Sequence, residues 1–286
     1  MSLNSVNTNV NASIALASLE MTSTQLAGVQ KQISTGYRVA DATDDGAAFA
    51  VAQRVRSDVN ALTSANQQLG NVQGLLSVTT SSLTDVSNTM SSARDVLVKL
   101  ADSNTQGTQR TQYIQQYQSL VTQIKTYFQD AAYNGKSLVG DMTGSAGTFG
   151  GVGVVRNEVG ATYGISTFSG SAFMASISFT STQLSAATTV GGLISATTTS
   201  GAFINKVNQL GTELNSYGAA TNYVTNQITY NNDKMNALNN GLGALVDADL
   251  AKESAQLQAL QIRQQLGTQA LSIANQSPQS LLSLFK

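Results

Sequence analysis

Apolar residues recur at alternating spacings of three and four along most of the chain, as in helices that pack along one face. The longest run begins at Val55, after which every seventh residue is apolar as far as Leu97. Because the positions three residues further on are also mostly apolar, the pattern predicts a long coiled-coil helix over about 47–101. Its seam consists of Leu62, Leu69, Leu76, Leu83, Met90 and Leu97.

Two further runs repeat this seam. One covers 113–131, and the polar residues 102–108 before it predict that it folds back on the first helix as an antiparallel hairpin. The other covers 207–245, and its seam includes Leu210, Leu214, Ile228, Met235 and Leu242. Asn231 interrupts this third seam. Two interpretations stay open: a buried asparagine that fixes the helix register, or a partly exposed side chain without that role.

Both ends of the chain have the same periodicity and a wider apolar face. Residues 1–33 contain only two charged residues, Glu20 and Lys31. The two terminal helices predicted here can cover each other only in part, so their surplus apolar surface predicts burial against other chains. The predicted contact residues are Leu19, Leu26, Val29, Ile33, Leu250, Leu257, Leu260 and Leu271.

The segment 142–201 differs from the rest of the chain. It contains 21 Ser or Thr and 11 Gly but only two charged residues, Arg156 and Glu158. Apolar residues alternate with small or polar ones in 151–155 and 175–179, which predicts short strands. We expect a small β-rich insertion at one end of the helical part, and a flexible loop is the alternative.

Composition removes several classes of function. The 286-residue chain has 15 Lys and Arg against 16 Asp and Glu, so no basic excess favours nucleic acid or an anionic membrane as a partner. It contains no Cys and no His, which removes the usual ligands of structural zinc and the common nucleophile and base pairs of enzymes. We therefore expect no catalysis, no metal, no cofactor, no nucleic acid partner and no membrane insertion.

Two pairs of acidic residues remain as candidates for acid–base or cation chemistry, Asp44 with Asp45 and Asp247 with Asp249. Each pair flanks a predicted helix, where a carboxylate can accept free N–H groups and interact with the helix dipole. Helix capping or interaction with the helix dipole is therefore the favoured role.

The order of the elements is symmetric, with terminal helices at both ends and the insertion between the long helices. Apolar stripes on helices of low charge are suited to side-by-side packing of copies, and contacts that do not close a ring propagate as a filament. The sequence thus favours a mainly α protein, a long antiparallel coiled-coil or helical-bundle rod with a small β-rich insertion, that polymerises as a structural subunit.

Five stretches of sequence resemble bacterial flagellins, the filament subunits of the flagellum, and the first of them, residues 6–9, resembles the family's opening. Residues 33–52 resemble the family's SSGxRINSAxDDAAGLAIA, and residues 133–138 resemble its FNGxxLL turn. Residues 247–253 resemble DADFAxE, and residues 274–285 resemble the closing ANQxPQxxLxLL. The polar motif residues carried over are Arg38, Asp44, Asp45, Asp247 and Asp249. The resemblance covers both ends of the chain and not its middle.

The resemblance implies three parts. Residues 1–42 would pair with 246–286 as helices that line the inner tube of a filament. Residues 43–140 and 202–245 would form a helical rod domain, and 141–201 would be a short, surface-facing insertion.

The resemblance also implies a route and partners. Flagellins are exported unfolded by the flagellar type III apparatus without a cleaved signal, and they assemble into an extracellular filament beneath a cap. Junction proteins join the filament to the hook, and a cytoplasmic export chaperone typically binds the C-terminal helix. The candidate chaperone contacts are Leu257, Leu260, Leu266, Leu271, Leu281, Leu282, Leu284 and Phe285.

One stretch departs from the family pattern. In the segment that the vertebrate Toll-like flagellin receptor contacts, Arg94 and the acidic Asp95 are kept, but Ser92 replaces an arginine. Serine cannot replace the bidentate donor that is lost. We therefore expect weak activation of that receptor, and strong activation by purified monomer in a reporter-cell assay would contradict this expectation.

Two other functions fit the same architecture. One is the flagellin-like protein at the hook–filament junction, and the other is a secreted, rod-like binding module that presents its insertion. An enzyme carried in the insertion is disfavoured, because this segment has one Arg, one Glu and no His.

Overall fold

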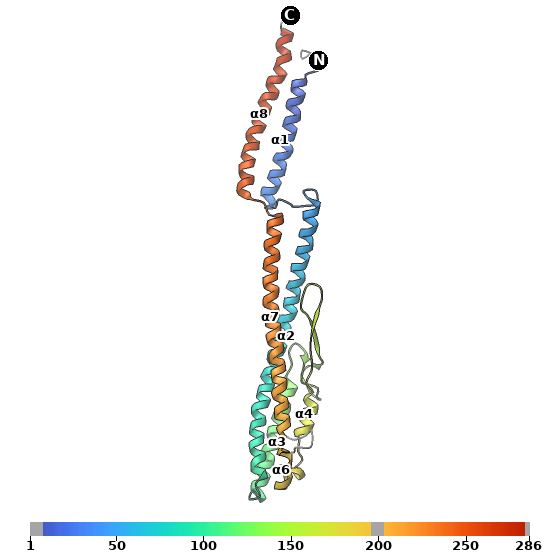
Figure 1. Ribbon diagram of the computed structural model, residues 1–286, viewed down its shortest axis with the longest axis vertical. Helices are drawn as coiled ribbons and strands as arrows, with labels where there is room; N and C mark the ends of the chain where they lie inside the picture. Colours follow the sequence, from blue (N-terminus) through green and yellow to red (C-terminus); the bar gives the residue numbers. More distant parts are fainter. Residues whose placement is uncertain (1–7, 196–202, 284–286) are drawn as a thin grey trace. The chain divides into compact units, whose positions relative to one another are not determined.

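The computed structural model describes residues 8–195 and 203–283, and over 277–283 it describes the backbone alone. Eight helices and four short strands account for most of these residues (Figure 1). The predicted fold class, mainly α with a small strand-containing part, is confirmed. Within the described residues, no helix combines the length and the apolarity that a membrane span requires.

The chain divides into two compact units. The first consists of Met1–Asp58 and Asn236–Lys286, and the second consists of Val59–Met235. Helices α2 (Gly46–Ala101) and α7 (Phe203–Val246) contribute residues to both units. The boundary between the units therefore falls inside two helices and not at a loop.

In the first unit, α1 (Val10–Thr35) lies beside α8 (Leu250–Ser283), as Figure 1 shows. Asn9 caps the start of α1, because its side chain accepts the N–H of Ala12 at 3.0 Å. The Asn9 Nδ2 atom also donates to the carbonyl of Ala274 at 2.7 Å. The start of α1 thus meets the later part of α8, and the two helices run antiparallel.

In the second unit, α3 (Gly107–Asp130) folds back along α2, so the predicted helical hairpin is confirmed. Near the start of α3, Arg110 donates to the carbonyl of Leu100 at 2.7 Å. Just after α3, the ring of Tyr133 lies against Gly74, where a Cβ atom would come within 2.6 Å of the ring. Residue numbers rise along α3 as they fall along α2, which defines an antiparallel pair.

Two small sheets follow α3. One is a parallel pair, β1 with β2, and the other is the antiparallel hairpin of β3 with β4. The strand predicted at 151–155 is confirmed as β3. The strands are β1 (Lys136–Ser137), β2 (Thr148–Phe149), β3 (Val152–Val155) and β4 (Thr162–Ile165).

The strand predicted at 175–179 is wrong, because α4 (Gly170–Ile177) covers its first half. Phe173, Met174 and Ile177 lie on one face of this helix, and all three are buried. Five residues of alternation are too few to distinguish a strand from a short helix whose apolar side chains share one face.

Helices α5 (Ser181–Leu184) and α6 (Ala187–Ser195) follow α4. The described part of the insertion predicted to be β-rich therefore contains more helix than strand. Phe168, Leu184 and Val190 from this segment are buried in the same core as α2, α3 and α7. The segment therefore completes the core of the second unit, and the flexible-loop alternative is wrong for its described residues.

Candidate assembly surfaces

The α1–α8 pair buries little of its own apolar surface. Among its described side chains, Val29 and Leu260 are the buried apolar ones. Leu250, predicted as a contact residue, is exposed at the start of α8. The other predicted contact residues are half-buried, namely Leu19, Leu26, Ile33, Leu257 and Leu271.

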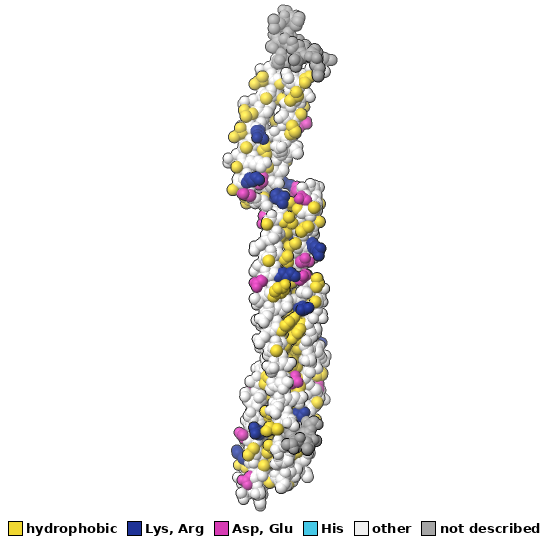
Figure 2. Space-filling view, viewed as in Figure 1, with side chains coloured by type: hydrophobic (Ala, Val, Ile, Leu, Met, Phe, Trp, Pro, Cys, Tyr) yellow, Lys and Arg dark blue, Asp and Glu magenta, His cyan; other side chains and the backbone are white. Residues whose placement is uncertain are grey.

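Large apolar side chains remain exposed on both helices. Ile14 is 64% exposed, Leu266 is 59% exposed and Ile273 is 69% exposed. Figure 2 shows such side chains over the visible face of the pair, with few charged groups among them. The full set that is at least half exposed is Val10, Ile14, Met21, Leu250, Ile262, Leu266 and Ile273. Apolar surface of this extent is typical of a protein–protein contact.

A groove runs between α1 and α8 along part of their length. Leu19, Met21 and Leu266 line it, together with Gly267. A Cβ atom at Gly267 would lie 3.2 Å from the Leu19 side chain, so the absence of a side chain lets the helices approach there. The groove adds apolar surface that a partner side chain can reach.

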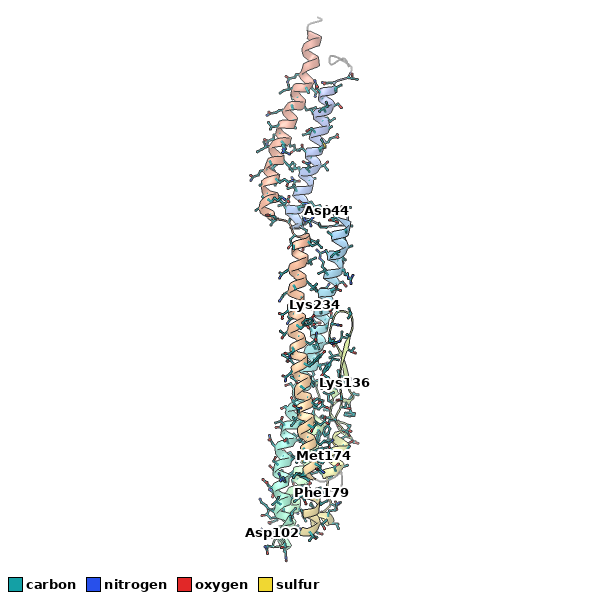
Figure 3. All side chains as sticks on the ribbon, in the orientation of Figure 1. Asp44, Asp102, Lys136, Met174, Phe179 and Lys234 are labelled. Carbon is teal, nitrogen blue, oxygen red and sulfur yellow. The ribbon has the colours of Figure 1, made fainter. Side chains whose placement is uncertain are left out.

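Three charged residues fix the segment between α1 and α2. The Lys31 Nζ atom lies 2.7 Å from a carboxylate oxygen of Asp41 and 2.8 Å from one of Asp44. The Asp44 carboxylate, labelled in Figure 3, also accepts the N–H groups of Ala40 and Asp41. The hydrogen bond from Lys31 holds the pKa of both carboxyl groups below its ordinary value. Asp44 therefore does not cap α2: its carboxylate pairs with Lys31 and accepts N–H groups of the segment before the helix.

The other acidic residues of the family motifs have different roles. Asp45 caps α2 by accepting the N–H groups of Ala47 and Ala48 at 3.1 and 3.0 Å. Asp249 caps α8 in the same way, with its carboxylate bound to the N–H groups of the first turn. Asp247 contributes through its backbone, which forms a bridge with Tyr37.

Arg38 joins the two linkers of the first unit. Its backbone N–H donates to the carbonyl of Val246 at 2.7 Å, and its guanidinium donates to the carbonyl of Leu245. In return, the N–H of Ala248 donates to the carbonyl of Gly36 at 2.9 Å. The segment after α1 is thereby held against the segment after α7. The polar residues of the family motifs thus bind backbone groups and hold the backbone in place.

The apolar seam of α2 is fully buried. Its six predicted residues, from Leu62 to Leu97, are all 0% exposed. On α7, Leu210 and Asn231 are also fully buried. The remaining predicted positions of α7 are half-buried, namely Leu214, Ile228, Met235 and Leu242.

The predicted receptor and chaperone residues are placed only in part. Ser92, Arg94 and Asp95 are exposed on α2. Leu281 and Leu282 lie in the helical backbone of α8, but their side chains are outside the described residues, as are Leu284 and Phe285 altogether.

Sequence reasoning missed two groups of contacts. One is the pairing of Lys31 with Asp41 and Asp44. The spacing of these three positions along the chain follows no helical period, so it gives no signal of the contact. The other joins Asn231 to Asn66 and to the β3–β4 hairpin. Both depend on loop or hairpin geometry, whereas helical periodicity reports only on residues that share a helix face. Within the described residues, no cluster of acidic side chains could hold a metal ion.

Both helical ends of the chain match known families. Residues 6–143 match the bacterial flagellin N-terminal helical region, and residues 199–285 match the bacterial flagellin C-terminal helical region. The chain is also 34% identical to flagellin FljM of Caulobacter vibrioides, with 100% of both chains covered. The chain belongs to the bacterial flagellin family. It is 30% identical to a flagellin of Brucella melitensis, with 99% of each chain covered.

A solved structure supports the fold of this flagellin. A protein described as a flagellar hook-associated protein of Vibrio parahaemolyticus has a TM-score of 0.55 at 15% identity. The match covers 71% of this chain and 100% of that one. The likeness concerns the fold alone. Membership of the family makes this flagellin a structural subunit that polymerises into the flagellar filament.

Proposed function

We propose that this flagellin is exported unfolded by the flagellar type III apparatus, without a cleaved signal, and polymerises outside the cell through its α1–α8 pair. The exposed apolar surface of that pair is the observation that supports the proposal. Ile262, Leu266 and Ile273 remain more than half exposed when the two helices are already packed together. Contacts with further copies would remove these side chains from water and complete the inner tube of the filament.

The size of the effect is comparable with the cost of association. Full burial of one large aliphatic side chain is worth about 1.5–3 kcal/mol. Several such side chains per subunit, each contributing part of that amount, offset the rotational and translational freedom lost on association, which costs about 4–15 kcal/mol. Because each subunit presents the same surface, the gain repeats at every addition.

The same surface explains the proposed partners. An exposed apolar stripe on one helix fits a groove-shaped binding partner. We assign this role on α8 to the export chaperone, with Leu266 and the tail residues Leu281, Leu282, Leu284 and Phe285 as contacts. The hook–filament junction proteins and the filament cap would meet the same elements at the two ends of the polymer.

Seeded polymerisation of purified monomer, imaged by electron microscopy, tests the proposal. The variant I262S/L266S/I273S removes exposed apolar groups from α8, and we expect at least tenfold slower elongation with unchanged helix content. The matched control is Q261S/Q265S/Q269S, which truncates exposed polar side chains on the same helix. The control should elongate normally.

Two results would contradict the proposal. Equal elongation of the two variants would remove the α1–α8 surface from assembly. A wild-type chain that stays monomeric with seeds present would favour the junction protein instead.

A further inference from the structure

A layer of amide side chains interrupts the apolar seam between α2 and α7. Asn231 of α7 is 0% exposed, and its Nδ2 atom donates to Oδ1 of Asn66 on α2 at 2.8 Å. The same Nδ2 atom donates to the carbonyl of Arg156 at 3.0 Å, and Oδ1 accepts from Gln227 at 3.0 Å. An asparagine amide has two N–H donors. One donor therefore goes to the opposite helix, and the other goes to the turn of the β3–β4 hairpin.

The β3–β4 hairpin is attached to one face of α7. The rings of Tyr163 and Tyr223 are stacked with their centroids 4.0 Å apart. Gln227 donates to the carbonyl of Arg156 at 3.2 Å. At the tip of the hairpin, Glu158 forms an ion pair with Lys234 of α7, with 2.5 Å between Oε1 and Nζ. Figure 3 places Lys234 at the level of that tip.

The α7 residues that bind the hairpin recur with the period of the helix. The α7 residues involved are spaced by four, four and three, which puts them on one face over three successive turns. They are Tyr223, Gln227, Asn231 and Lys234. Figure 1 shows the hairpin extended alongside the long helices of this unit. The hairpin is thus a strap along α7, and its Arg156 carbonyl is the point where the strap reaches the seam.

The register of α2 against α7 depends on the same atoms. A slip by one helical turn would take Asn231 away from Asn66 and place it among seam positions such as Leu62 and Leu69, which are fully buried and apolar. A buried amide without partners costs free energy, so the native register is favoured. The cost holds only while the site is closed to water, and the strap both covers the site and supplies the second acceptor.

We propose that the β3–β4 hairpin acts as a strap that fixes the register of α2 against α7 through Asn231. Docking of the strap and choice of register are then one equilibrium. With the strap docked, Asn231 is satisfied only opposite Asn66. With the strap removed, water satisfies the amide in any register, and the apolar seam alone permits neighbouring registers one turn apart.

Distance measurement between two spin labels tests this proposal in the full-length monomer. The chain contains no Cys, so the pair S91C/T229C carries the only labels. Both positions are exposed on their helices. Thr225 contacts Gln73, so the labels lie about 30 Å apart along the helices at 1.5 Å per residue. A slip by one turn changes that separation by about 5 Å.

We expect one narrow distance in the otherwise unchanged protein. The variant N231L and a variant with 156–161 replaced by Asn-Gly should each add a second distance, shifted by about 5 Å. Combining the two changes should add nothing further, because both act on one equilibrium. The control V159S alters an exposed side chain at the tip, and it should keep the single distance.

Each other pattern overturns the proposal. A single unchanged distance in both variants shows that the apolar seam fixes the register alone. A second distance in N231L only shows that the amide layer acts without the strap. A second distance in the shortened hairpin only, or a further change in the combined variant, shows that the strap acts by a route other than Asn231.

Discussion

At the scale of single residues, the motif carboxylates act on backbone geometry. The sequence predicts caps at two acidic pairs, but it cannot say which member of a pair caps the helix. In Asp44-Asp45 the second residue caps α2, whereas the first accepts from Lys31 at 2.8 Å. The choice depends on the turn before the helix, which brings Lys31 to Asp44 and has no periodic signature.

The contribution of the Asp45 cap to the free energy of unfolding can be measured. Replacing a capping aspartate by alanine leaves N–H groups of the first turn without an acceptor and costs about 1 kcal/mol. We therefore expect D45A to lower the free energy of unfolding by about that amount, as measured by urea denaturation. D45N keeps an acceptor oxygen and should stay close to the unchanged protein. Equal losses in the two variants would mean that the charge, and not the cap, stabilises α2.

At the scale of elements, helical periodicity predicts the long helices and fails in the middle. Six fully buried positions on α2 repeat every seven residues, so the signal accumulates over the whole helix. Helix α4 spans only 8 residues, and its start depends on Asp141, which accepts from Ser169 and Ser171 across 28 to 30 residues of sequence. Such a contact is set by the fold, and no local pattern reports it.

The ion pair between Glu158 and Lys234 predicts a pH dependence for the strap. The hydrogen bond from Lys234 lowers the pKa of Glu158 below its ordinary value of 4.5. A carboxyl group whose pKa is lowered in the folded state stabilises the protein above its ordinary pKa, and this contribution is lost as the pH falls through the folded value. Acid should therefore weaken the attachment of the hairpin to α7.

Urea unfolding at a series of pH values measures this contribution. Between about pH 5 and pH 3, the free energy of unfolding should fall less steeply in E158Q than in the unchanged protein. The control is D95N, an exposed position on α2 that forms no ion pair within the described residues. D95N should keep the original slope, and parallel slopes for all three proteins would assign the acid sensitivity to other carboxyl groups.

At the scale of the whole molecule, burial is distributed unequally between the two units. The second unit holds a continuous core in which α2, α3, α7 and the middle segment all take part. In the first unit, α1 has 26 residues and a single buried one, Val29. A net charge of −1 provides little repulsion between copies. Helical periodicity reports the surplus apolar surface at the ends of the chain, but it carries no signal of what packs against that surface.

The unequal burial of the two units predicts which helices of the monomer unfold locally. Amide hydrogens exchange quickly where few apolar contacts hold a helix, and slowly in a closed core. In the monomer, amides of α1 and α8 should exchange at least tenfold faster than those of α2 between Leu69 and Leu97. In the filament, the proposed contacts with other copies would cover Ile14, Leu266 and Ile273, and the two groups of amides should then exchange similarly slowly. Hydrogen exchange followed by mass spectrometry resolves both states. Slow exchange of α1 and α8 in the monomer would mean that the helix pair is stable alone, and the exposed apolar side chains would then serve recognition without being needed to order the ends of the chain.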